Sequence, residues 1–161
     1  MKNRNPLGED GRSIVEFAFA CAVLFGMLFG IIYFCMALYT YHYISEAARE
    51  GSRYAIVRGS TSCINTPGLT NCDATNSEIQ TYLQDLGYPG IDAANRMTVN
   101  TTWYTPNAAA SPPWSLCTTP PCNVPGSIVN VQVTYTYPLS IPFYGAKTIS
   151  MTSTSQMVIA Q

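Results

Sequence analysis

Histidine and charged residues are both scarce in this chain. Of its 161 residues only His42 is a histidine, and Asp, Glu, Lys and Arg make up 11%, less than half of the usual ~25%. One histidine excludes metal sites built on two, and a net charge of −1 gives no basic surface for nucleic acid. The sequence also has no nucleotide-binding glycine loop and no paired carboxylates. We therefore expect no catalytic residue, no metal and no cofactor.

The charged residues are distributed unevenly along the chain. Residues 1–58 contain eleven of them, and residues 59–161 contain only six. The second part is rich in Thr, Ser, Asn and Pro instead. We therefore expect a boundary near Gly59, followed by one small head domain.

The run from Phe17 to Tyr39 has 23 residues and no charge. About 20 apolar residues cross the ~30 Å hydrocarbon core of a bilayer as a helix. A buried core helix is disfavoured because the run has no polar face, and a cleaved secretory signal would be shorter and end in small residues. We expect a single transmembrane span, with Tyr41, His42 and Tyr43 joining Tyr39 in an aromatic belt at the membrane boundary.

Beyond this span, apolar residues recur at steps of three and four, which predicts that the helix continues outside the membrane. The recurring residues are Ile44, Ala47, Ala48, Gly51, Tyr54 and Ala55, and the charged pairs between them are Glu46–Arg49 and Glu50–Arg53. One helix is expected over residues 13–58, with Gly51 or Gly59 as a weak point or a C-terminal cap.

The head is predicted to contain a short helix and an antiparallel sheet. Thr75 and Glu78 have the spacing of a capping box, which predicts a helix over residues 76–86. Alternating residues predict strands over 97–104, 128–137 and 147–159, with irregular segments over 60–74 and 105–126. One-sided strands form an antiparallel sheet with one dry face, which the helix segment 44–58 would cover. The expected fold class is α+β, with a long N-terminal helix packed on a small antiparallel sheet.

The alternation also predicts which strand residues are buried. They are Met97, Val99 and Trp103 in the first strand, Val129, Val131, Val133, Tyr135 and Tyr137 in the second, and Ile149, Met151, Met157 and either Val158 or Ile159 in the last.

The six cysteines form two groups. Cys21 and Cys35 lie in the apolar run, where they are expected to act as small hydrophobic side chains. The head contains Cys63, Cys72, Cys117 and Cys122, which predict two disulfides. Three pairings are possible, and we favour 63–72 and 117–122 because each pair flanks one irregular segment. Zinc is the alternative, but the spacings C-x8-C and C-x4-C are not the usual zinc spacing and no histidine joins them.

The orientation of the span follows from the disulfides. Basic residues lie on both sides of the apolar run, so charge alone does not decide it. Disulfides form in oxidising compartments outside the cytoplasmic membrane. We therefore expect the N-terminus in the cytoplasm and the head outside.

Glu16 is a charged residue at the start of the apolar run. It could be a boundary carboxylate that the positive end of the helix dipole favours. Its surroundings suggest a second interpretation, because Gly11 lies five residues before it and Phe17 follows it. A cut after Gly11 would remove a short polar leader and make Glu16 the fifth residue of the mature chain.

This arrangement resembles a type IV prepilin cleavage site, and more specifically the TadE-like minor pilins (pseudopilins) of tight-adherence, or Flp, pili. The resemblance lies in Gly11-Arg-Ser-Ile-Val-Glu-Phe-Ala-Phe19 and Ala47-Ala-Arg-Glu-Gly-Ser-Arg-Tyr-Ala55. It implies a leader of residues 1–11 that a prepilin peptidase removes between Gly11 and Arg12, then a helix over 12–58 and an extracytoplasmic head over 59–161.

The resemblance also implies a role for Glu16. In the filament it would pair with the new α-amino group of Arg12 on the next subunit, because a buried carboxylate needs a partner. Gly26 and Gly30 would form a close-packing face between helices, or are merely tolerated in a span. The implied partners are other pilins and minor pilins, the prepilin peptidase and the assembly platform of the bacterial inner membrane. The implied location is that membrane, and after incorporation the extracellular pilus.

Three functions therefore compete. The first is a non-enzymatic pilus subunit or assembly factor. The second is a single-pass, membrane-anchored binding or sensor domain that never polymerises. The third and weakest is an anchored enzyme. Cleavage after Gly11 distinguishes the first function from the second.

Overall fold

The computed structural model describes residues 7–141 and 145–160. The chain divides into two compact units, Met1–Leu38 and Tyr39–Gln161. Helix α1 covers Leu7–Ile56 and supplies residues to both units. It begins earlier than the expected residue 13, because no proline interrupts the sequence between Pro6 and Pro67.

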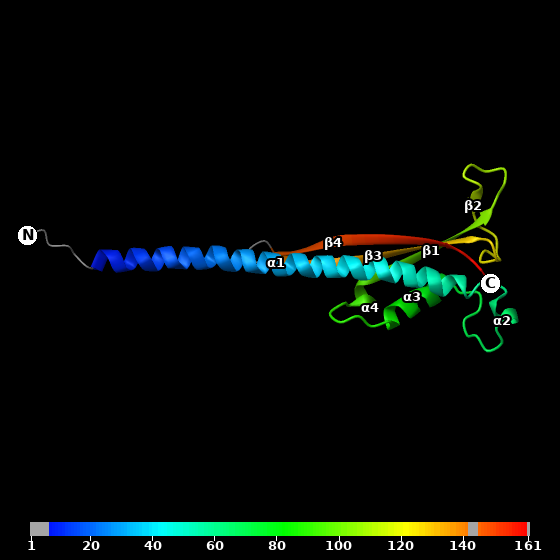
Figure 1. Cartoon of the computed structure of the whole chain (residues 1–161), viewed down its shortest axis with the longest axis horizontal. Helices are drawn as coiled ribbons and strands as arrows, with labels where there is room; N and C mark the ends of the chain where they lie inside the picture. The colour runs from blue at the N-terminus through cyan, green and yellow to red at the C-terminus, as the bar shows by residue number, and fades with distance from the viewer. Residues whose placement is uncertain (1–6, 142–144, 161) are drawn as a thin grey trace, which may run out of the picture. The chain divides into compact units, whose positions relative to one another are not determined.

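The second unit contains a four-stranded antiparallel sheet in the order β2-β1-β3-β4 (Figure 1). Its strands are β1 (Met97–Pro106), β2 (Trp114–Leu116), β3 (Ile128–Ile141) and β4 (Gly145–Val158). The α+β class and the antiparallel sheet are thus confirmed. Strand β2 lies within the segment expected to be irregular, because three residues are too few to produce a recognisable alternation.

Three short helices complete the second unit. Helix α3 covers Asn76–Asp85, and its predicted capping box is confirmed. The backbone N–H of Thr75 donates to Glu78 Oε2 at 2.8 Å, and that of Glu78 donates to Thr75 Oγ1 at 3.4 Å. The four-residue helices α2 (Ser62–Asn65) and α4 (Ala93–Arg96) were not expected, since a single turn has no periodic pattern.

One face of the sheet is buried, as the alternation predicts. All five inward residues of β3 from Val129 to Tyr137 are buried, together with Met97 and Val99 of β1, whereas Trp103 is half-buried. In the last strand Met151 and Met157 are half-buried, and Ile159 is buried.

Of the two alternatives at the end of the last strand, Ile159 is the buried residue. Val158 is 55% exposed because it lies on the opposite face from Met157 and Ile159. The expectation that Ile149 is buried is wrong. Ile149 is on the inward face, yet it is 43% exposed. Strand β4 forms one edge of the sheet and has a neighbouring strand on only one side.

The C-terminal part of α1 covers the dry face. From Ile44 onward its buried positions are mostly small, which lets the helix backbone lie close to the sheet; they are Ile44, Ala47, Ala48, Gly51, Ser52, Tyr54 and Ala55. A Cβ atom on Gly51 would lie 3.0 Å from Val131 Cγ1 of β3 and 3.0 Å from Leu83 Cδ1 of α3. Gly51 is thus the point at which α1 fits between the sheet and α3. It is neither a weak point nor a cap.

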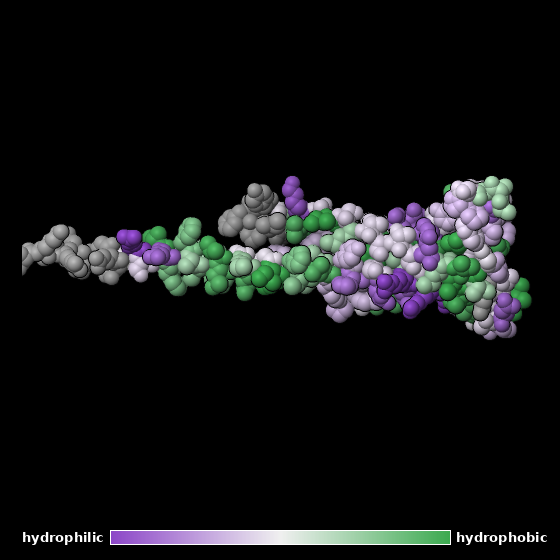
Figure 2. Space-filling model, turned by 45° about the horizontal axis from the view of Figure 1, so that its top comes forward, coloured by the Kyte–Doolittle hydropathy of each residue, from purple (hydrophilic) through white to green (hydrophobic). Residues whose placement is uncertain are grey.

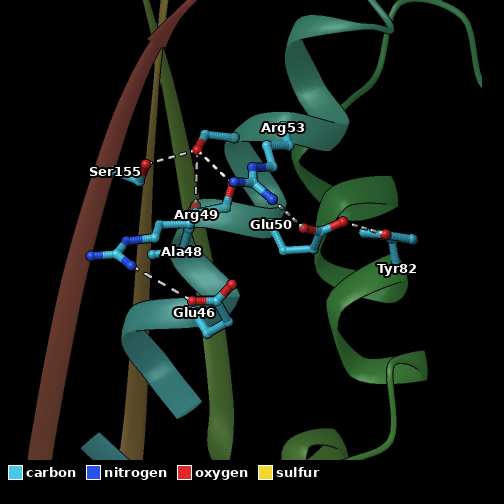
Figure 3. A network of polar contacts seen from close by, with 8 residues as sticks. Glu46, Ala48, Arg49, Glu50, Arg53, Tyr82 and Ser155 are labelled. Carbon is cyan, nitrogen blue, oxygen red and sulfur yellow. Dashed lines mark hydrogen bonds and ion pairs between the residues drawn. The ribbon is translucent and has the colours of Figure 1, made fainter. Parts of the chain in front are cut away.

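Two hydrogen bonds fix this part of α1 on either side (Figure 3). The Ser52 and Ser155 hydroxyls are 2.8 Å apart and join α1 to β4. The Tyr82 hydroxyl donates to Glu50 Oε1 at 3.0 Å and joins α3 to α1. Sequence reasoning identified neither bond, because each joins residues far apart in the chain.

Tyr43 is buried in the head and does not belong to an aromatic belt. Its side chain is 3% exposed and its hydroxyl donates to Met97 Sδ at 3.3 Å. Its ring lies against Tyr88 and Tyr135, with centroids 4.6 Å and 6.5 Å away. Burial, together with these two tyrosines, raises the pKa of Tyr43 to about 12.

We predict that Gly51→Val destabilises the head. The new side chain would collide with Val131 and Leu83 on two sides, which we expect to lower the free energy of unfolding by about 2 kcal/mol or more. Gly26→Val is the matched control, since no atom lies within 4 Å of a Cβ built there. Urea unfolding of the detergent-solubilised chain, followed by tryptophan fluorescence, measures both. Equal stability of the two variants would contradict the close approach at Gly51.

We also predict a loss of head stability at alkaline pH. An unfolded tyrosine titrates near pH ~10, whereas Tyr43 in the fold titrates at about 12. Its contribution to stability is therefore complete below pH ~10 and falls between ~10 and ~12 by up to ~1.4 kcal/mol per pH unit. Tyr43→Phe should remove that part of the slope in urea unfolding. Tyr41→Phe, at an exposed position, should leave the slope as it is.

Candidate assembly segment and disulfide-bonded head

The four residues of the expected processing and assembly segment all lie in α1. Gly11, Arg12, Glu16 and Phe17 are exposed, and no atom lies within 4 Å of a Cβ built on Gly11. The Gly11–Arg12 peptide bond is inside the helix, four residues after its start at Leu7. A protease would therefore have to open the first turns of α1 to reach it.

The helix places Arg12 and Glu16 on one face, because residues four apart are neighbours. Within the described part of the chain, however, Glu16 forms no ion pair, whereas the pairs Glu46–Arg49 and Glu50–Arg53 form at 3.7 and 3.9 Å as the sequence predicts. Glu16 directly precedes Phe17, the first residue of the apolar run. It can accept a cation from another chain without breaking a bond within its own.

Large apolar side chains are exposed along the helix of the first unit, and the face in view in Figure 2 is mostly hydrophobic. Phe17, for example, is 71% exposed. The others are Ile14, Val15, Phe19, Val23, Leu24, Phe25, Met27, Leu28, Phe29, Ile31, Ile32, Phe34, Met36 and Leu38. By length and composition this helix can cross a membrane, and its most apolar window is not buried in the protein.

Gly26 and Gly30 lie one turn apart within this apolar surface. No atom of the described chain lies within 4 Å of a Cβ built at either position. Together they leave a strip of exposed helix backbone on one face. Another helix can approach closely at such a strip, as in the small-residue contacts of membrane helices.

The head cysteines are joined in two local disulfides. Cys63 is bonded to Cys72, and Cys117 is bonded to Cys122, each with a Cα–Cα distance of 5.6 Å. This is the pairing that the sequence favoured, and it leaves none of these sulfurs as a thiol for zinc. Cys21 and Cys35 are free.

The Cys63–Cys72 loop is attached to the end of α1 through aromatic and polar contacts. The Arg58 guanidinium lies 3.8 Å from the centroid of the Tyr54 ring, which stacks on Tyr82 at 4.2 Å. Asn71 Nδ2 donates to the Tyr54 hydroxyl at 3.2 Å, and the N–H of Ala74 donates to the Arg58 carbonyl at 3.0 Å. The sequence pattern placed Tyr54 on the apolar face of the helix but indicated none of these contacts.

The surface of the head is hollowed beside Tyr54 and Tyr82. The stacked tyrosines border an open hollow of about 340 Å³ that is lined mainly by polar side chains. Burial and the bond to Glu50 raise the pKa of Tyr82, so its hydroxyl is a donor at neutral pH. Within the described chain, no three His, Cys, Asp or Glu side chains gather at a possible metal site.

Comparison with known proteins gives one family. The family model for TadE-like proteins matches residues 11–53, so the resemblance seen in the sequence is confirmed over this segment. The match begins at Gly11 and extends through Gly51, at which α1 fits against the head. No curated protein and no solved structure matches the chain.

We predict that removing the first disulfide destabilises the head. The double variant Cys63→Ser, Cys72→Ser should lose about 2–3 kcal/mol, because the bridge closes a short loop in the unfolded chain. The control Cys21→Ser, Cys35→Ser should unfold like the wild type. Alkylation without reduction, followed by mass mapping, should label Cys21 and Cys35 alone. Labelling of all four head cysteines would refute both bridges.

Proposed function

We propose that this chain is a non-enzymatic minor pilin, or pseudopilin, that takes part in assembling a tight-adherence type pilus. The observation that carries the proposal is the TadE-like match over residues 11–53, which begins at the glycine where a leader would end. A TadE-like segment supports association with the pilus machinery. The finer role as a subunit is our proposal.

Before incorporation, α1 anchors the chain in the bacterial inner membrane. The exposed apolar surface of residues 14–38 supports this proposal, because water would strongly disfavour it while lipid would not. The two head disulfides support an oxidising location for the head. The N-terminus then lies in the cytoplasm and the head outside.

Processing removes residues 1–11 through a prepilin peptidase. The scissile bond after Gly11 lies in the second turn of α1, where glycine lowers helix stability by about 1 kcal/mol relative to alanine. Helix ends fray, and proteolysis acts on such opened segments. Opening the turns before Arg12 exposes the bond without disturbing the rest of α1.

In the filament, Glu16 pairs with the new α-amino group of Arg12 on a neighbouring subunit. Outside the membrane the apolar surfaces of neighbouring helices pack together, and a carboxylate between them needs a cation. The pair would set the axial register between subunits, and the strip at Gly26 and Gly30 would let their helices approach. Other pilins and minor pilins and the inner-membrane assembly platform are the proposed partners.

A second candidate is an anchored binding or sensor domain that never polymerises. The polar hollow beside Tyr54 and Tyr82 favours it, since a small polar ligand could lie there. This candidate requires the membrane span but not cleavage after Gly11. Processing at that bond is therefore the first test of the proposal.

We predict that the mature chain begins at Arg12 in a strain with an active prepilin peptidase. Gly11→Val should leave the full-length precursor, because a branched side chain replaces the smallest residue at the cut. Gly8→Val is the matched control and should be processed normally. Intact mass of the membrane-bound chain decides the matter, and an uncut wild type spanning Met1–Gln161 would exclude the pilin proposal.

We predict that Glu16→Ala lowers incorporation into pili but not insertion into the membrane. The neighbour's amine would remain buried without a partner, which costs about 3–5 kcal/mol if the pair is fully buried. Glu16→Asp should be intermediate, because it keeps the charge with a shorter reach. Glu46→Ala, at an exposed surface pair, should incorporate normally. The measured quantity is the amount of this chain in sheared pili relative to membranes, and equal ratios would leave Glu16 as a boundary residue.

A further inference from the structure

The two edges of the sheet differ in whether their outward backbone groups have hydrogen-bond partners. At the β1 edge, the Thr101 N–H donates to Asn76 Oδ1 of α3 at 2.8 Å, and the Trp103 carbonyl accepts from the Cys117 N–H at 2.9 Å. Strand β2 pairs with the remainder, from Tyr104 to Pro106. At the β4 edge, no backbone hydrogen bond is found on the outer side of the described residues 145–158.

The register identifies which groups of β4 face outward. Thr101 pairs with Val131, and its N–H points away from β3 to Asn76. Since N–H and C=O alternate in direction along a strand, Val131 must bond to Ser155 on the other side. The even-numbered residues beside Ser155, such as Thr154, then direct their N–H and C=O groups outward. The outward row contains Ala146, Thr148, Ser150, Thr152, Thr154, Gln156 and Val158.

This outer edge lacks the usual protection against strand pairing. Exposed edges are usually short or carry charges, prolines or bulges. Strand β4 has 14 residues, its register with β3 is unbroken, and it contains no proline and only one charge, Lys147. Beyond its end, the N–H of Ala160 donates to the Ile56 carbonyl of α1 at 3.4 Å. The unprotected row therefore lies between the β3–β4 connection and the end of α1.

We propose that β4 is a strand-addition edge, and that an extended segment of a different polypeptide pairs with it as a fifth strand. Evenly repeated N–H and C=O groups along 14 residues are matched by another extended backbone and by no small ligand. The outward-pairing residues are mostly Thr and Ser, which suit a pleated, uncharged pairing surface.

The side chains of β4 indicate the residue pattern of a segment that could pair with it. On the dry face, Met151 and Met157 are only half-buried, so a fifth strand with apolar residues beside them would complete the cover. On the other face, Thr152 and Thr154 are exposed to solvent. The partner segment would therefore alternate apolar and uncharged polar residues and contain no proline.

Given the proposed membrane attachment, the β4 strands of two symmetric copies of this chain cannot pair with each other. Tyr43 meets Tyr135 whereas Gly51 meets Val131, so β3 runs opposite to α1 and β4 runs along it. If the β4 strands of two copies paired antiparallel, their α1 helices would also run in opposite directions. Both helices, however, would have to come from the same membrane. Two symmetric parallel β4 strands would bring the Met151 face of one copy beside the Thr152 face of the other. The occupant is therefore a different chain.

Amide hydrogen exchange tests this proposal on the full-length protein. One sample is the chain purified in detergent from a host without pilus genes, and the other is native membranes and pili of the producing strain. Peptides covering residues 145–158 are compared by mass spectrometry. In the purified chain we expect about half of these amides to be protected by β3 and the outward half to exchange quickly. In the native sample we expect the outward amides to be protected as well.

Two proline variants provide a matched comparison. Thr152→Pro removes an outward N–H and no bond to β3, so the head should stay folded while the native-sample protection is lost. Ser153→Pro removes a bond to β3 and should destabilise the head itself. Equal exchange in the two wild-type samples would overturn the proposal, whatever the variants do. Protection of the outward amides already in the purified chain would overturn it too.

The test of strand addition can succeed or fail independently of the tests of the proposed function. Processing at Gly11 and recovery in sheared pili are measured independently of exchange in β4. A processed, pilus-associated chain whose β4 edge exchanges freely would retain the proposed function and refute strand addition. A protected edge on a chain that keeps its leader would do the reverse.

Discussion

The close approach between α1 and β3 is the constraint on which the head depends. At Gly51 the helix backbone has Val131 on one side and Leu83 on the other, so that even one added carbon would be crowded. This fit requires small residues on the helix, Val and Tyr at alternate positions of β3, and an apolar face on α3. The bonds of Ser52 to Ser155 and of Tyr82 to Glu50 then fix the helix in place. These polar bonds are possible only because the backbones are already close.

The amino-acid composition of α1 differs between the two compact units to which it contributes. Up to Leu38 the exposed positions carry large apolar side chains, which lipid or neighbouring helices can cover. In the second unit most buried positions after Ile44 are small, and several exposed positions are charged, as at Glu46 and Arg49. The change occurs where the chain passes from the first compact unit to the second. A helix without proline can make this change without breaking its hydrogen-bond ladder.

Much of this fold could be predicted because its signals are local. The alternation from Val129 to Tyr137, the capping box at Thr75 and the short spacing between paired cysteines each depend on neighbours in sequence. Tyr43 was misread because its partners, Met97 and Tyr135, lie more than fifty residues away. Gly51 was read as a weak point for the same reason. Strand β2 is too short to show a period, and Val158 and Ile159 differ by a single residue, which reverses the face.

The candidate site was predictable to a different extent. The spacing of Gly11, Glu16 and Phe17 identified the assembly segment, and the family match covers that segment. The sequence did not reveal that the Gly11–Arg12 bond lies inside a helix, because the leader has no apolar periodicity from which a helix start can be read. The free edge of β4 was equally hidden. An edge is defined by which strands pair, and strand order depends on contacts that no local pattern encodes.

The local pairing of the head disulfides has a consequence for biogenesis. Cys72 follows Cys63 by nine residues and Cys122 follows Cys117 by five, and both pairs precede the central strand β3 at Ile128. A head that emerges N-terminal end first would present each cysteine with its correct partner before the next pair appears, and short loops close at the lowest entropic cost. Oxidation can then be complete while β3 and β4 are still being delivered. When the chain emerges in this order, each cysteine therefore meets its own partner first, which favours the local pairing over the two alternatives.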